Sequence, residues 1–92
     1  MQLAWGANRA KVLRRRLDQL AAADNLEILG RVHGRTHELK GKRAGQLSLD
    51  LDGGHRLIVE PANDPVPRKA DGGLDWPKIT AVRVLAVEDT HE

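Results

Sequence analysis

The sequence predicts a single small α+β domain over residues 1–92, with an N-terminal helix, or helical hairpin, followed by three strands. Three observations predict this class. Apolar residues recur at helical spacing near the start of the chain, alternate with polar residues between positions 46 and 60, and are largely β-branched at positions 79–87. Hydrophobic residues make up 40% and charged residues 30% of the chain, which are ordinary proportions for a globular protein.

A helix is predicted over residues 7–23 because apolar side chains recur there at i, i+3, i+4 and i+7 spacing. The stripe consists of Ala10, Leu13, Leu17, Leu20 and Ala21. Asp24-Asn25 is the expected break. Leu26 and Leu29 are then expected to cover the core from a short helical turn that Gly30 ends.

Strands are predicted over residues 46–51, 56–60 and 79–87. Asp52-Gly53-Gly54 is the expected hairpin turn between the first two, because glycine adopts positive φ without a Cβ clash. Pro61 ends the second strand, and the last strand is expected to lie buried between neighbours. The predicted core residues of the strands are Leu47, Leu49, Leu51, Leu57, Val59, Val82, Val84, Leu85 and Val87, with Arg56, Ile58 and Glu60 on the opposite face.

Two further segments are less regular. Residues 31–45 are polar and are predicted to form a loop that leads into a strand, with His37–Lys40 already extended. Residues 61–77 hold all four prolines and are predicted to be either an ordered excursion or a mobile loop.

Composition excludes several classes of protein. The chain has no cysteine, which excludes a disulfide framework and a thiolate zinc site. It has no apolar run near the roughly 20 residues that span a bilayer and no signal-peptide core, so a cytoplasmic protein without a membrane partner is expected. The aromatic residues are Trp5 and Trp76, which limits the surface available for base stacking.

The charge is distributed unevenly along the chain. Residues 1–43 carry ten Lys and Arg against four Asp and Glu, whereas residues 44–92 carry five against nine. The basic first part offers a surface for a polyanion, although a solvated helix face explains the charge equally well.

Histidines are the side chains best suited to proton transfer near neutral pH, and the chain has four: His33, His37, His55 and His91. Gly34 lies between His33 and His37 and argues against a helical metal pair, so neither a metal nor another cofactor is expected. The basic segment 37–43, Arg56 and the C-terminal histidine would together suit a phosphodiester if the sheet gathers them. The alternative is a set of unrelated surface charges.

Five segments, taken in order, resemble the HigB-type (plasmid maintenance killer) branch of the RelE/ParE toxin superfamily. They are Arg16-Leu17…Leu20…Ala22, His37-Glu38-Leu39-Lys40-Gly41, Arg56-Leu57-Ile58, Gly72-Gly73-Leu74-Asp75-Trp76…Ile79-Thr80 and Glu88-Asp89-Thr90-His91. The resemblance covers the chain from Gly6 onward. It implies helices packed on one face of a small, curved, mainly antiparallel sheet.

The resemblance also implies an activity, which is cleavage of mRNA in the ribosomal A site, and a partner, which is a helix-turn-helix antitoxin of the HigA type. The catalytic residues that it implies are His37, Arg56, Asp89 and His91. Lys40 matches a phosphate-binding lysine. Further RNA and phosphate contacts, including contacts to rRNA, are expected from Lys42, Arg43, Arg14 and Arg15.

RNA supplies its own nucleophile, the 2′-hydroxyl, so the protein need only move protons and stabilise the phosphorane. No metal is needed if Arg56 and Lys40 supply the positive charge. His37 and His91 are expected to act as base and acid, in an order that the sequence leaves open. Asp89 is expected to orient His91 or to favour its protonated form.

The chain departs from the family at two points. Thr90 stands where the family usually has a tyrosine, and only Met1–Trp5 precede the matching region, so an edge strand is expected to be missing. These departures favour an inactive, toxin-like binding module that pairs with an antitoxin, and a homodimer is one way to cover an exposed sheet. A ParE-like gyrase inhibitor is the third alternative.

Two candidate residues also have structural interpretations. Arg56 could form a cross-strand salt bridge with Asp50 or Glu60. Trp76 is expected to anchor the proline-rich loop to the core rather than to stack on a base.

Overall fold

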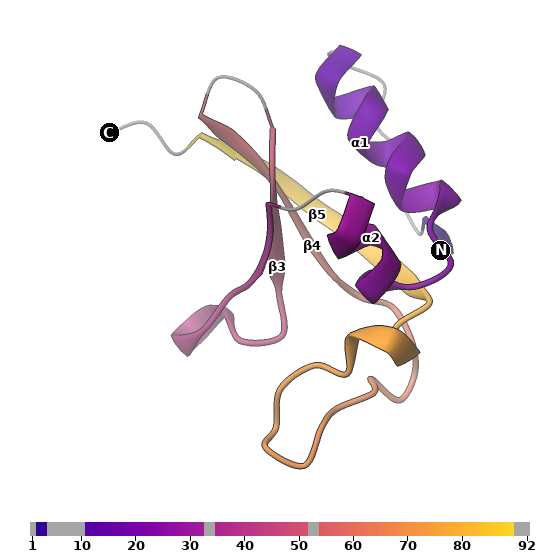
Figure 1. Ribbon diagram of the computed structural model, residues 1–92. Helices are drawn as coiled ribbons and strands as arrows, with labels where there is room; N and C mark the ends of the chain where they lie inside the picture. Colours follow the sequence, from indigo (N-terminus) through magenta and orange to yellow (C-terminus); the bar gives the residue numbers. More distant parts are fainter. Residues whose placement is uncertain (1, 4–10, 33–34, 52–53, 90–92) are drawn as a thin grey trace.

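A computed structural model describes residues 2–3, 11–32, 35–51 and 54–89 and has an α+β architecture (Figure 1). Two helices lie against one face of a five-stranded sheet with the order β1-β5-β4-β3-β2. Neighbouring strands are antiparallel except β1 and β5, which are parallel. The predicted class is therefore confirmed. The strands are β1 (Gln2–Leu3), β2 (Thr36–Glu38), β3 (Leu47–Asp50), β4 (His55–Pro61) and β5 (Ala81–Asp89).

The two helices are α1 (Lys11–Ala22) and α2 (Leu26–Val32). The predicted break between them is confirmed. The side-chain Oδ1 of Asn25 accepts a hydrogen bond from the Ile28 amide at 2.9 Å, so Asn25 caps the start of α2. The predicted start of the first helix, near Ala7, lies outside the described residues. Within the described part of the chain, no helix is long and apolar enough to cross a membrane.

The prediction that Gly30 ends the second helical segment is wrong. Gly30 lies inside α2, which continues to Val32. A Cβ at this position would lie 3.0 Å from Cζ3 of Trp76. Glycine is used here because the indole packs against the backbone of the helix, not because the helix ends.

The predicted hairpin between β3 and β4 is confirmed. The two strands pair in antiparallel register, and the Leu51 amide donates to the His55 carbonyl at 2.8 Å. Gly54 has a φ of 80°, which is the positive value that a tight turn requires. The other two turn residues, 52 and 53, lie outside the described part.

β1 was not predicted, whereas β2 (Thr36–Glu38) overlaps the segment His37–Lys40 that was predicted to be extended. β1 has two residues, and a segment this short shows no alternation that a sequence pattern can reveal. β1 pairs with Ala81 and Val82 at the start of β5. The expectation that the chain lacks an edge strand is therefore wrong, because a two-residue strand occupies that edge.

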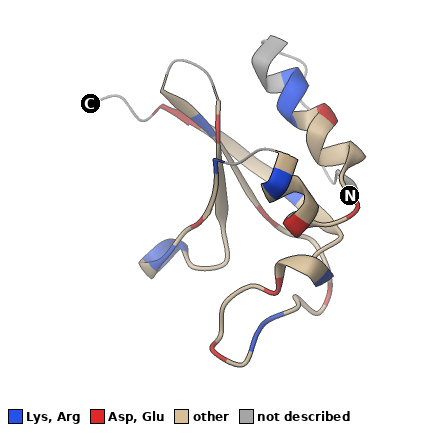
Figure 2. Ribbon diagram, in the orientation of Figure 1, with Lys and Arg blue, Asp and Glu red and all other residues tan. Residues whose placement is uncertain are grey.

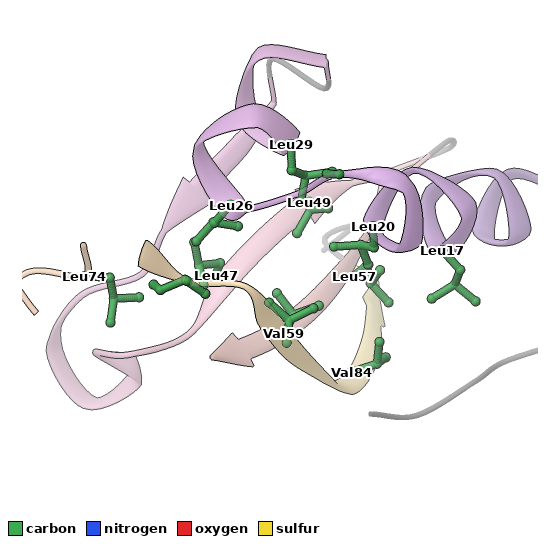
Figure 3. Close-up of a cluster of buried hydrophobic side chains, with 13 residues drawn as sticks. Leu17, Leu20, Leu26, Leu29, Leu47, Leu49, Leu57, Val59, Leu74 and Val84 are labelled. Atoms are coloured by element: carbon green, nitrogen blue, oxygen red, sulfur yellow. The ribbon is translucent and has the colours of Figure 1, made fainter. Parts of the chain in front are cut away.

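The hydrophobic core lies between the two helices and the sheet (Figure 3). Leu17 and Leu20 of α1 and Leu26 and Leu29 of α2 meet the side chains that alternate along the strands. The buried strand residues of this cluster are Leu47, Leu49, Leu57, Val59, Val82 and Val84. The predicted core face is thus confirmed for these six positions, and Leu51 packs against its margin.

Leu85 and Val87 were predicted to be buried but are 39% and 44% exposed. The register of β4 against β5 shifts between Ile58 and Val59, which interrupts the alternation at Leu85. The pairing of β1 with β5 ends at Val82, so it does not reach the second half of β5.

The proline-rich connection is ordered, which decides between the two predicted alternatives. Arg68 and Leu74 form an isolated β-bridge, and the 3₁₀ helix η2 (Trp76–Lys78) precedes Ile79. Leu74 and Ile79 are buried in the core, at 1% and 0% exposure. These two apolar side chains fix the end of the connection to the helical face of the sheet.

Candidate functional site on the open face of the sheet

The candidate site lies on the face of the sheet opposite the two helices, which we call the open face. Strand register defines two rows of residues on it. The first row is His37, Ser48, Ile58 and Ala86, and the second is Asp50, Arg56 and Glu88. Ile58 lies on the predicted face, but it is only 1% exposed.

The centre of the open face is a cluster of three charged side chains, Arg43, Glu88 and Arg56. Arg43 donates from Nη1 to Oε1 of Glu88 at 2.9 Å and from Nη2 to Oε2 at 2.6 Å. Arg56 donates from Nη2 to Oε1 of the same carboxylate at 3.1 Å. This is a bidentate arginine–carboxylate pair with a second arginine at its side, the geometry that fixes both partners most firmly.

Arg43 reaches Glu88 from a distant part of the chain. It ends the 3₁₀ helix η1 (Gly41–Arg43) between β2 and β3, whereas Glu88 lies on β5. In the sheet, β3 and β4 lie between these two segments. Ser48 of β3 and Ile58 of β4 are 3% and 1% exposed, which agrees with coverage by the long side chains of the cluster.

The hydrogen bonds from Arg43 hold the pKa of Glu88 below its usual value. Desolvation opposes this effect, and the hydrogen bond from Arg56 and the charges of both arginines lower the pKa further. The same hydrogen bonds raise the pKa of Arg43. Glu88 is therefore an anion at neutral pH. The three side chains are 31–36% exposed, so water and salt screen the cluster.

Arg56 has a buried hydrogen-bond donor, Nε, that the cluster does not use. This donor has no hydrogen-bond partner among the described residues. A buried donor without a partner is unfavourable, and it marks the position as one where a further acceptor would be stabilising.

The predicted salt bridge of Arg56 with Asp50 or Glu60 is wrong, although Arg56 does form a salt bridge across the strands. Its partner is Glu88. Asp50 instead accepts from Nε of Arg35 at 3.0 Å, and Glu60 pairs with Arg83 at 3.4 Å.

His37 lies on the open face together with Arg56. It is exposed, and it pairs with Ser48 on the neighbouring strand. From the spacing between strands and the rise per residue, the Cα atoms of His37 and Arg56 lie roughly 12 Å apart. Lys40 and Lys42 are exposed at the turn that follows β2, which Figure 2 shows as a basic segment remote from the helices.

Asp89 and Glu88 point to opposite faces of β5, because successive residues of a strand alternate. Asp89 is in register with His55, whereas Glu88 is in register with Arg56. The carboxylate beside Arg56 is thus Glu88. The predicted partner of Asp89, His91, and the neighbouring Thr90 lie outside the described residues, so the pairing of His37 with His91 stays a prediction.

Arg14 and Arg15 belong to a different part of the surface. Both are exposed on α1, on the helical side of the sheet (Figure 2), and Arg14 pairs with Asp18 at 3.7 Å. Arg16, the third member of this run, docks the helix. Its Nε donates to the carbonyl of Asp50 at 3.2 Å.

Glu38 lies within the predicted basic segment, but its side chain forms hydrogen bonds at the edge of the hydrophobic core. Its carboxylate accepts the indole N–H of Trp76 at 2.9 Å and the amide of Leu74 at 3.2 Å. The prediction that Trp76 anchors the proline-rich connection is confirmed, since the indole also packs against the core cluster.

Sequence reasoning missed the role of Glu88, which was noted only as part of the C-terminal segment. The alternation of β5 could have placed Glu88 on one face, but only the register could have placed it beside Arg56. Among the described residues, no group of three or more His, Cys, Asp or Glu is arranged to hold a metal ion. Comparisons of the chain with protein-family models, curated proteins and solved structures found no match.

Proposed function

We propose that this chain is a toxin of the RelE/ParE superfamily, of the HigB type, that cleaves mRNA in the ribosomal A site without a metal. The observation that supports the proposal is that an exposed imidazole, His37, lies on the same open sheet face as Arg56, whose guanidinium is held with that of Arg43 by Glu88. An imidazole beside cations is the chemistry that phosphodiester cleavage requires.

In the proposed mechanism the 2′-hydroxyl of the substrate attacks the neighbouring phosphate, the bond from phosphorus to the 5′-oxygen of the next nucleotide breaks, and that oxygen leaves with the proton from the acid. His37 and His91 transfer the two protons, one as base and the other as acid. Arg56 stabilises the charge on the phosphorane, and Lys40 binds a flanking phosphate. The proposed partner that neutralises the activity is a helix-turn-helix antitoxin of the HigA type, and Arg14 and Arg15 on α1 would meet rRNA through phosphate contacts.

Induced expression in bacteria tests this function. Wild-type protein should arrest growth and produce cuts in mRNA that follow the codon period. His37→Ala, Arg56→Ala or His91→Ala should each lower the cleavage rate by about 10²–10⁴-fold, which is the usual contribution of a positioned proton donor or charge. Arg83→Ala is the matched control, because Arg83 is an exposed arginine of the same sheet that pairs with Glu60. Equal toxicity of all the variants would reject the assigned roles.

A non-catalytic, toxin-like binding module is the second candidate, and Glu88 is the observation that favours it. Its carboxylate engages the guanidinium groups of both Arg43 and Arg56, which a substrate phosphate would need. A folded wild-type protein that neither arrests growth nor cuts mRNA, yet binds a helix-turn-helix antitoxin, would establish this alternative.

A further inference from the structure

The Arg43–Glu88–Arg56 cluster has the form of an occupied anion site. Three N–H groups, contributed by two arginines from separate segments of the chain, converge on one carboxylate at 2.6–3.1 Å. Arginine presents its donors in a planar fork that fits a carboxylate and a phosphate equally well. A phosphate group would therefore fit the same donors that the Glu88 carboxylate now uses.

Charge and donor number both favour phosphate over the carboxylate. Two guanidinium groups face a single anionic side chain, so the cluster keeps an excess positive charge. Nε of Arg56 remains a buried donor without a partner among the described residues. A phosphate offers more acceptor oxygens and a greater negative charge than Glu88, and it could use the donor that the carboxylate leaves unsatisfied.

We propose that Arg43 and Arg56 form a two-arginine clamp for a phosphate oxyanion and that Glu88 is its intramolecular competitor. The inference rests on the proposed function for the source of the phosphate, which would be the RNA backbone. It adds two features to that function: the joint action of Arg43 and Arg56 on one phosphate, and Glu88 as a specificity-determining residue.

Removal of the competing charge tests the clamp. Glu88→Gln keeps the size of the side chain but leaves both guanidinium groups without an anionic partner. Inorganic phosphate is titrated at constant ionic strength, and the Nε–H signals of the arginines are followed by NMR. The variant should bind phosphate about tenfold more tightly than wild type, because a competing negative charge has been removed. The phosphate-induced changes in chemical shift should occur at the Nε–H signals of Arg43 and Arg56.

Glu60→Gln is the matched control. It removes one carboxylate from the open face of β4 and changes the net charge equally, but its partner is Arg83. The control should bind phosphate as wild type does. An equal gain in both variants, no gain in Glu88→Gln, or shifts confined to arginines outside the clamp would overturn the proposal.

A second titration distinguishes the source of the phosphate. A short single-stranded RNA should gain affinity in Glu88→Gln by a similar factor if the clamp takes a backbone phosphate. A gain with inorganic phosphate alone would assign the clamp to free phosphate. Binding is measured separately from cleavage, so the two proposals can fail independently. A protein that does not cleave mRNA but binds phosphate more tightly as Glu88→Gln would refute the nuclease and support the clamp. A protein that cleaves mRNA but gains no affinity as Glu88→Gln would support the nuclease and refute the clamp.

The wild-type chain provides a test that does not depend on the folding of a variant. Saturating phosphate should shift the Nε–H signals of Arg43 and Arg56 together with the carboxylate carbon of Glu88, because the ion pairs must separate. The signal of Arg83 should stay in place. Phosphate that shifts Arg83 and leaves Glu88 unchanged would contradict the competition.

Discussion

The two faces of the sheet use the same alternating strands for different purposes. On the helical face, leucine and valine side chains from β3 and β4 are fully buried beneath α1 and α2. On the open face, the intervening residues of these strands include Arg56, and the surface is organised by ion pairs. Leu57 and Arg56 are adjacent in sequence, yet one is in the core and the other is in the candidate site.

This contrast shows that two adjacent residues of one strand can serve different ends, one contributing to stability and the other to the candidate site. Apolar contacts on the helical face are made among buried groups, so a change there leaves a cavity. Contacts on the open face are exposed to water, and their energies are screened. Substitutions on the first face should alter the free energy of unfolding, and substitutions on the second should mainly alter binding.

The largest effect is expected for Leu57→Ala on the helical face. Leu57 is 0% exposed, so truncation should lower the free energy of unfolding by about 2–5 kcal/mol, measured by urea denaturation. Val87 is its partner across the ladder and is 44% exposed. Val87→Ala should change stability by no more than about 0.5 kcal/mol. Similar losses for both variants would contradict the boundary of the core.

A smaller effect is expected where a charged residue serves the core. Glu38→Ala removes the acceptor of the Trp76 indole N–H and of the Leu74 amide. Loss of this acceptor should cost about 1–3 kcal/mol in the free energy of unfolding. The fluorescence of Trp76 should shift as its surroundings become more polar. Glu27→Ala, which removes a carboxylate paired with the exposed Arg31, is the control and should leave both measurements nearly unchanged.

The next effect is a pH dependence that originates on the open face. The folded-state pKa of Glu88 is lowered, first by the hydrogen bonds from Arg43. The stability that this ion pair contributes is thus present above the ordinary pKa of glutamate and is lost as the pH falls through the lower folded-state value. Wild type should exceed Glu88→Gln in stability at neutral pH, and the two should converge in acid.

Urea denaturation at a series of pH values measures this convergence. Repeating the comparison with Arg43→Gln in both proteins completes a double-mutant cycle. The pH-dependent difference should shrink when Arg43 is absent. A difference of unchanged size would assign the effect to a partner other than Arg43.

The smallest effect is expected on α1, away from both the core and the clamp. Arg14 and Asp18 form an exposed pair at 3.7 Å, with side chains 60% and 72% exposed. Arg14→Ala should therefore leave the free energy of unfolding within about 0.5 kcal/mol of wild type. In the proposed function it should weaken association with ribosomes in a salt-dependent way, which co-sedimentation at two salt concentrations measures.

Much of the fold could be predicted because its signals are local. The leucine spacing of α1, the alternation in β3 and β4, the Gly54 turn and the stop at Pro61 each depend on a few neighbouring residues. The exposure of Leu85 could not be predicted, because a register shift interrupts the alternation of β5 at this residue. Val87 is in register with the buried Leu57, but it lies beyond the pairing with β1, which ends at Val82. The interior position of Gly30 was missed because its cause is an indole 46 positions away in the chain.

The candidate site shows the same division. The sequence by itself determined which face of β4 carries Arg56, because side chains of a strand alternate with a period of two. Only the tertiary structure decided that Arg43 and Glu88 meet there, since they lie 45 positions apart. That contact depends on strand order and register. Both are set by pairing and packing between distant parts of the chain, so the residues next to Arg43 and Glu88 in the sequence do not reveal them.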